Sequence, residues 1–148
     1  MQQNRYNNKG RSFELNNPES LSDPSSLAYS HLGAVPAGQQ LIFVAGQSGT
    51  EAGPEDFTAQ CIVALNNVEK VMSAAGGELK DIVKWTIFIV DHNEIKHRII
   101  IEEIQKRFGD LFTPACSLVP VPRLATPDAL IEIEAIGAID TIDRPYPI

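Results

Sequence analysis

Apolar and polar residues alternate most regularly in residues 130–136. The odd-numbered positions of this run are apolar, whereas Glu132 and Glu134 lie on the other side together with Leu130 and Ile136. This period of two predicts a strand that carries two carboxylates on one face, about 7 Å apart along the chain. A glutamate on a strand this apolar is either exposed to solvent or points into a polar cleft.

A second extended segment precedes this strand. Leu118, Val119 and Val121 give it an apolar and partly β-branched character, and Pro120 and Pro122 favour an edge strand because proline has no backbone N–H to donate. The residues between the two strands, 123–128, contain Pro127-Asp128 and are typical of a turn-rich loop.

Three further strands are expected in the first third of the chain. Residues 11–15 predict a short strand, and residues 29–35 and 41–46 predict two strands joined as a hairpin by a turn at 36–39. Residues 41–45 are apolar throughout, which is typical of a strand covered on both faces.

Two helices flank a strong central strand. Apolar residues recur at three- and four-residue spacing from Pro54, which is expected in the first helical turn, to Ala75. Gly76-Gly77 predicts the end of this helix. The expected buried stripe consists of Phe57, Cys61, Ala64, Leu65, Val68, Met72 and Ala75. Residues 82–90 predict a strand. A second helix follows, capped by Asp91 or Asn93 and ended by Gly109, with Ile95, Ile99, Ile100, Ile104 and Phe108 as its apolar residues. This order predicts an α+β fold, with the two helices on one face of a mixed sheet.

Composition narrows the class of protein. The chain of 148 residues carries a net charge of −7, which repels phosphate backbones, so nucleic acid is not an expected partner. No apolar run is long enough to span a bilayer, and the polar N-terminus lacks a signal-peptide core; we expect a cytoplasmic protein with no membrane partner. We expect a disordered lead at 1–10, one domain at 11–140 and a tail at 141–148.

Motifs along this chain resemble those of the RidA/YjgF family of reactive imine and enamine deaminases, formerly labelled L-PSP endoribonuclease. Three segments near the C-terminus carry the resemblance: Pro114-Ala115-Cys116-Ser117, Val119-x-Val121-x-Arg123-Leu124, and residues 131–136, Ile-Glu-Ile-Glu-Ala-Ile. Tyr29-Ser30-His31 and residues 43–47, Phe-Val-Ala-Gly-Gln, match earlier family segments. The resemblance implies a chorismate-mutase-like fold and a homotrimer around a central barrel, with ligand clefts between subunits.

The resemblance also implies a site. Glu132 would orient the attacking water as the catalytic residue, and Tyr29, Gly46 and the position of Cys116 would bind the substrate. The family's usual residue at that last position is an arginine that holds the substrate carboxylate, which a neutral thiol cannot do. No cofactor is expected.

Other readings of these residues stay open. Cys116 fits either a small packed side chain or a nucleophilic thiol, and His31 is a possible base for it. Arg123 fits a structural ion pair or a ligand contact. His92 and His97 have the wrong spacing for one metal face, so no metal is expected.

Three functions follow from these readings. The first is hydrolysis of an imine or enamine metabolite, with a substrate range altered at Cys116. The second is a catalytically silent trimer that binds a small metabolite in the same clefts. The third is thiol chemistry at Cys116.

Overall fold

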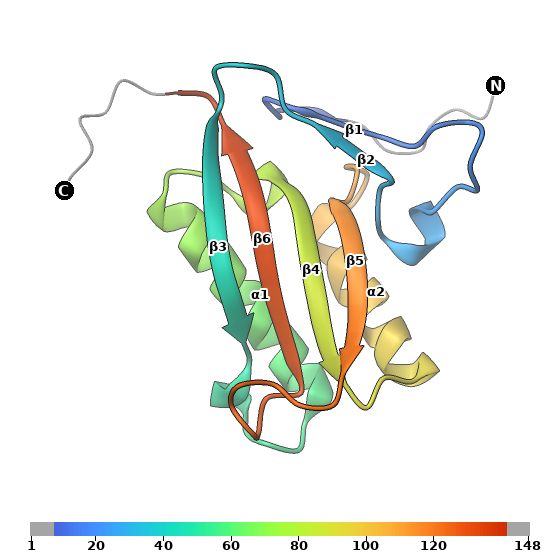
Figure 1. Ribbon diagram of the computed structural model, residues 1–148, viewed down its shortest axis with the longest axis vertical. Helices are drawn as coiled ribbons and strands as arrows, with labels where there is room; N and C mark the ends of the chain where they lie inside the picture. The colour runs from blue at the N-terminus through green and yellow to red at the C-terminus, as the bar shows by residue number, and fades with distance from the viewer. Residues whose placement is uncertain (1–7, 142–148) are drawn as a thin grey trace.

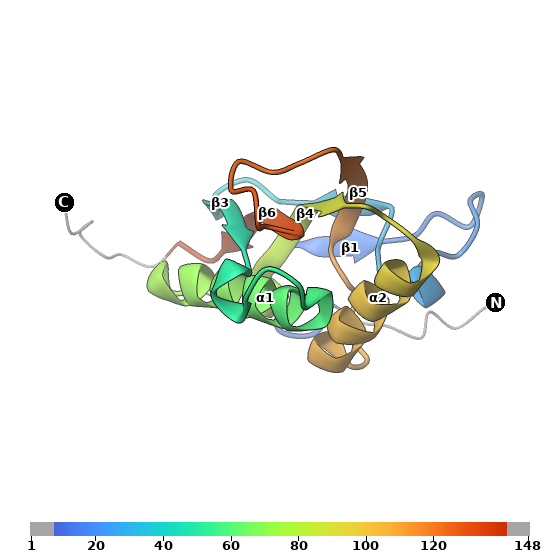
Figure 2. The same cartoon turned by 90° about the horizontal axis from the view of Figure 1, so that it is seen from below.

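A computed structural model describes residues 8–141 and contains two layers (Figure 1). Four strands form a mixed sheet, and helices α1 and α2 cover one of its faces, as the view from below shows (Figure 2). The predicted α+β layout with two helices on one face of a mixed sheet is therefore confirmed. None of the helices within residues 8–141 has both the length and the apolar character needed to cross a membrane.

The main sheet has the strand order β3-β6-β4-β5. β6 is antiparallel to both of its neighbours, β3 and β4, whereas β5 runs parallel to β4. The strands are β3 (Gln40–Ser48), β4 (Ile82–Val90), β5 (Ala115–Val121) and β6 (Ile131–Ile139). β5 is an edge strand, as its prolines predicted, and α2 makes the crossover that a parallel β4–β5 pair requires.

Capping residues mark both ends of the two helices. Helix α1 (Phe57–Ala74) begins after Asp56, whose carboxylate accepts a hydrogen bond from the Ala59 N–H at 2.9 Å. Pro54 therefore lies upstream of the helix and not in its first turn as expected, because Asp56 satisfies the free N–H groups. At the other end Gly76 has φ +86° and its N–H bonds back to Ser73, as the paired glycines predicted.

Helix α2 (Glu94–Phe108) begins after Asn93, whose side chain accepts from the Lys96 N–H at 2.9 Å, and is followed by Gly109. Its apolar face packs Ile100, Ile104 and Phe108 into the core. Ile95, expected on the same stripe, is instead 69% exposed, because it lies about two and a half turns before Ile104 and therefore on the opposite side of α2.

The main core lies between the sheet and the helices. β4 contributes Trp85, Ile87 and Ile89, and alternate residues of β6 contribute Ile131, Ile133 and Ala135, all with at most 4% of their surface exposed. Cys61 on α1 is fully buried among them, as its place on the apolar stripe predicted. The alternation predicted for residues 130–136 is therefore confirmed, and it leaves Glu132 and Glu134 on the sheet face away from the helices.

The expected hairpin between residues 29–35 and 41–46 is wrong. β2 (Leu32–Ala34) pairs with β1 (Glu14–Asn16) in a separate two-stranded sheet, and β3 pairs with β6. The turn at 36–39 therefore connects two sheets. β1 and β2 pack over Val83 at the start of β4, where Phe13, Leu15, Val83, Phe112 and Ala138 form a small second core.

Within residues 8–141, the sheet face opposite the helices is covered only at the end where β1 and β2 pack over Val83 and Ala138, and we call the rest of it the open face. It carries Phe43, which is 72% exposed, with Leu41 and Ile136 beside it. β3 is thus covered on one side only, whereas its apolar sequence predicted cover on both. Residues 1–7 and 142–148, most of the expected lead and tail, lie outside the described residues.

Candidate functional site

Tyr29 is held beside the start of β5 by its neighbour in the sequence. The buried Ser30 hydroxyl donates to the Thr113 carbonyl at 2.6 Å, and the Ser30 N–H donates to the Pro114 carbonyl at 3.1 Å. These bonds join segments more than eighty residues apart in the chain. They place Tyr29 next to the strand that carries Cys116.

Tyr29 and Cys116 line one cavity of about 270 Å³ between β4, β5 and α2, which we call the β5 cavity. Most of its other lining residues are aliphatic: Leu27, Ala28, Ile87, Ile100, Ile101, Ile104 and Leu118, with His97 as a further polar group. No lysine or arginine is among the residues that line it. The site residues expected at 29 and 116 therefore come together, in an apolar setting.

Cys116 faces the helix layer. It lies beside Trp85 in the parallel β4–β5 ladder, and in such a ladder neighbouring side chains point to the same side of the sheet. Burial is the main cause that raises the pKa of the Cys116 thiol, to about 12, although the Trp85 indole N–H and Lys84 oppose the shift. The thiol is therefore neutral at physiological pH.

The Trp85 indole lies behind this thiol. Its ring is 1% exposed and packs edge-on against Phe108, with the ring centroids 5.6 Å apart. The indole N–H is close enough to the Cys116 sulfur to affect its pKa, yet it makes no hydrogen bond of normal geometry. A buried donor without a full partner is uncommon in proteins.

Glu132 lies elsewhere, on the open face. It stands opposite Ser48 of β3 and Phe88 of β4. A bulge in β3 sets Ala45 and Gly46 against β6 here, since the register shifts between Val44 and Gln47. The carboxylate of Glu132 occupies the space that a β-carbon at Gly46 would fill, so glycine is required for this arrangement.

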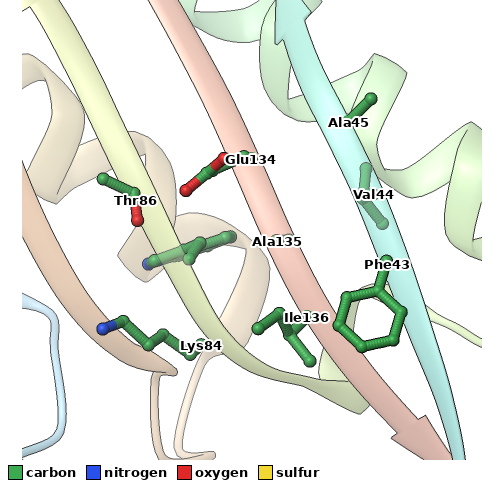
Figure 3. Close-up of a pocket in the computed structure, with 9 residues that line it drawn as sticks. Phe43, Val44, Ala45, Lys84, Thr86, Glu134, Ala135 and Ile136 are labelled. Carbon is green, nitrogen blue, oxygen red and sulfur yellow. The ribbon is translucent and has the colours of Figure 1, made fainter.

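The open face has a shallow pocket of about 460 Å³ between β3, β6 and β4 (Figure 3). Phe43 and Ile136 form one side of it, and Lys84, Thr86 and Glu134 supply polar groups from β4 and β6 (Figure 3). The expected site residues thus form two groups within one chain: Tyr29 and Cys116 line the β5 cavity, whereas Gly46 and Glu132 lie on the open face.

The two other candidates, His31 and Arg123, lie outside both groups. His31 packs edge-on against Tyr29, with 5.4 Å between ring centroids, and its Nε2 is 2.9 Å from the Ser22 carbonyl oxygen. It does not line the β5 cavity. Arg123 is exposed in the loop after β5, where its guanidinium donates to the Leu124 and Ala125 carbonyls.

Sequence reasoning did not indicate that His97 and Ile101 of α2 would line a cavity with Tyr29 and Cys116. His97 and Ile101 line the β5 cavity, together with Ile100 and Ile104 on the same helix face. The i, i+3, i+4 spacing of these residues could have indicated the face, but not that Tyr29 would pack over it. The rings of His92 and His97 are 5.4 Å apart, and residues 8–141 contain no group of three or more side chains placed to hold a metal ion.

Comparisons with known proteins agree with the fold and the motifs. The profile of the family described as Endoribonuclease L-PSP matches residues 21–139. A 2-iminobutanoate/2-iminopropanoate deaminase of Salmonella typhimurium is 39% identical over 94 residues, which are 60% of this chain and 68% of that protein.

Solved structures show the same fold. YyfB of Yersinia pestis, a protein of the Rid family, superposes with a TM-score of 0.80 at 26% identity and covers 86% of this chain and 99% of its own. The structure of Escherichia coli TdcF with bound serine gives a TM-score of 0.56 at 30% identity, over 77% of this chain and 95% of its own. The chain described here belongs to the Endoribonuclease L-PSP family, also called the RidA/YjgF family.

Proposed function

We propose that this protein hydrolyses imines or enamines to carbonyl compounds and ammonia, in clefts between the subunits of a homotrimer. The observation that carries the proposal is the division of the site into two halves. Tyr29 and Cys116 lie on the helix side of β5, and Gly46 and Glu132 lie on the opposite side of the sheet, near β3. One chain cannot bring the two halves onto one substrate.

A cyclic assembly would join them. If the β5 edge of one subunit docks against the open face of the next, each contact unites a β5 cavity with a neighbouring Glu132. Such a head-to-tail contact closes into a ring when the rotation between subunits fits. The exposed Phe43 and Ile136 support an assembly that covers the open face, because apolar patches of this kind are typical of interfaces.

Hydrolysis of an imine in this cleft needs only proton transfers and the addition of water. A water molecule adds through its oxygen to the carbon of the C=N bond while Glu132 accepts one of its protons, and the imine nitrogen gains a proton. The carbinolamine then loses the hydroxyl proton and expels the protonated nitrogen as ammonia, which leaves a C=O bond. Proton transfers of this kind by a positioned carboxylate contribute about 10²- to 10⁴-fold to the rate.

The name of the Salmonella typhimurium relative supports this reaction type. A nuclease reading of the family name is less well supported, since the net charge of −7 opposes binding to phosphate backbones.

A silent metabolite-binding trimer is the second candidate. It is favoured by the β5 cavity, whose lining has no lysine or arginine to hold a carboxylate. Thiol chemistry at Cys116 is less well supported, because the raised pKa of that thiol leaves little thiolate at neutral pH.

The test compares two glutamates on one strand face. Imines are generated in situ from amines or amino acids by an oxidase, and ammonia release is followed with and without the protein. We expect Glu132→Gln to lose about 100-fold or more in the catalysed rate. Glu134→Gln, two residues along β6 on the same face, should retain most of it. Equal activity in the two variants would contradict the proposal, and no catalysis by the unmodified protein would favour the silent trimer.

A further inference from the structure

We infer that the β5 cavity selects neutral compounds with an apolar chain, so that the substrates are imines of aldehydes or ketones and not of 2-oxo acids. The inference rests on the proposed function, because it assigns a substrate class to that site. It comes from the lining of the cavity, its volume and the state of its polar groups.

The lining sets the polarity of the ligand. Its aliphatic members come from four separate segments, among them Ile87 of β4, Ile101 of α2 and Leu118 of β5. A carboxylate moved into such surroundings loses its hydration without gaining a lysine or arginine as a partner, which disfavours its binding. A neutral alkyl or aryl group gains free energy there through burial of its apolar surface.

The volume sets the size of the ligand. A dry apolar cavity of about 150 Å³ accepts benzene. The β5 cavity, at about 270 Å³, therefore has room for a branched alkyl chain or a substituted ring.

Apart from the imidazole of His97, the polar groups of the cavity are uncharged donors or weak acceptors. Tyr29 offers a hydroxyl, and Cys116 offers a thiol whose pKa burial raises to about 12. The Trp85 N–H behind it makes no hydrogen bond of normal geometry and adds no charge. These groups can hydrogen-bond the nitrogen or oxygen of a neutral imine or its carbonyl product, but they cannot neutralise an anion.

The chain carries its own reporter for this site. Trp85 is the one tryptophan in the sequence, and its indole lies close to the thiol of Cys116, which lines the cavity. A ligand that enters the cavity should change the emission of Trp85.

The experiment is a titration of Trp85 fluorescence, repeated by calorimetry, with two probes of the same carbon chain. The first probe is 4-methyl-2-pentanone and the second is 4-methyl-2-oxopentanoate, in which a carboxylate replaces a methyl group. We expect the ketone to bind about tenfold or more tightly than the oxo acid. Cys116→Arg should reverse this order, because it supplies the missing cation.

Two variants on one helix locate the binding. Ile101→Phe should fill the cavity and abolish ketone binding, whereas Ile95→Phe, at a position 69% exposed on the same helix, should leave it unchanged. Circular dichroism of each variant checks that it folds. Tighter binding of the oxo acid to the unmodified protein, or unchanged ketone binding in a folded Ile101→Phe variant, would overturn the inference.

The outcome is separable from that of the hydrolysis assay. If the ketone binds in the cavity but no imine is hydrolysed, the selectivity stands and the proposed reaction fails. If imines of 2-oxo acids are hydrolysed faster than neutral imines, the proposed reaction stands and the selectivity fails.

Discussion

The carboxylate of Glu132 on β6 lies where a β-carbon at Gly46 on β3 would stand. Because glycine has no side chain, it leaves room for this carboxylate on the open face. The bulge beside Gly46 brings the two strands into this arrangement. The relationship makes Gly46 a positioning residue for Glu132, and it can be tested without removing the carboxylate.

Gly46→Ala should displace Glu132 and leave the fold intact. The new methyl group meets the end of a flexible side chain on an open surface, so stability should change by about 1 kcal/mol or less. A shift of about 1 Å in a catalytic group costs as much as about 100-fold in rate. We therefore expect kcat to fall about 10- to 100-fold while KM and the melting temperature change little. An unchanged kcat would show that the position of Glu132 does not matter to the reaction.

Assembly should depend on the open face. Light scattering of the unmodified protein should give about three times 16.2 kDa. Phe43→Asp should shift the protein to smaller species, because it buries an unpaired carboxylate in the expected interface. Ile95→Asp changes a residue of similar exposure on α2 and should leave the trimer intact. A monomeric unmodified protein would remove the inter-subunit cleft and the function built on it.

Hydrolysis of imines from ordinary α-amino acids should be weak. A carboxylate that lacks its arginine partner loses about 2–4 kcal/mol of transition-state binding, or roughly 30- to 1,000-fold in kcat/KM. Cys116→Arg should recover part of this loss, because position 116 opens into the β5 cavity. The measurement is kcat/KM beside an arginine-containing relative in the same assay. Equal values for that relative and the unmodified protein would contradict the expectation.

Both cysteines should be inert at neutral pH. Burial is the main cause that raises the pKa of Cys61 and of Cys116 to about 12. Since the thiol loses its proton only as the pH rises towards that pKa, about one molecule in 10⁵ carries a thiolate at pH 7. Iodoacetamide should label the native protein very slowly at pH 7 and the unfolded protein rapidly. Fast labelling of native Cys116 would revive the thiol hypothesis.

The sequence allowed much of the fold to be predicted, because the main elements depend on local patterns. The alternation in residues 130–136 placed Ile133 in the core and Glu132 outside it, and Asn93 and Gly109 bounded the second helix. The pairing of strands was harder to predict. A turn at 36–39 is compatible with a hairpin, and only tertiary contacts over Val83 direct β2 to β1 instead.

The sequence indicated candidate site residues but not how they are arranged in space. Family motifs indicated Tyr29, Cys116 and Glu132 without showing that the first two lie on one side of the sheet and the third on the other. The aliphatic contribution of α2 has no motif of its own, since Ile101 resembles any core residue of a helix. Ile101 lines the β5 cavity together with Tyr29 because the hydrogen bonds of Ser30 bring Tyr29 to the start of β5.

We propose that each active site takes Tyr29 from one subunit and Glu132 from the next, and mixing of variant subunits distinguishes this arrangement from a site within one chain. Tyr29→Ala and Glu132→Gln proteins, each inactive alone, are mixed in equal amounts and refolded together, beside a mixture of the unmodified protein with the double variant. If clefts form between subunits, about a quarter of them combine two intact halves in either mixture, so each should show about a quarter of full activity. If both residues act within one chain, the first mixture stays inactive and the second retains about half of full activity, and a site shared between subunits would then be ruled out.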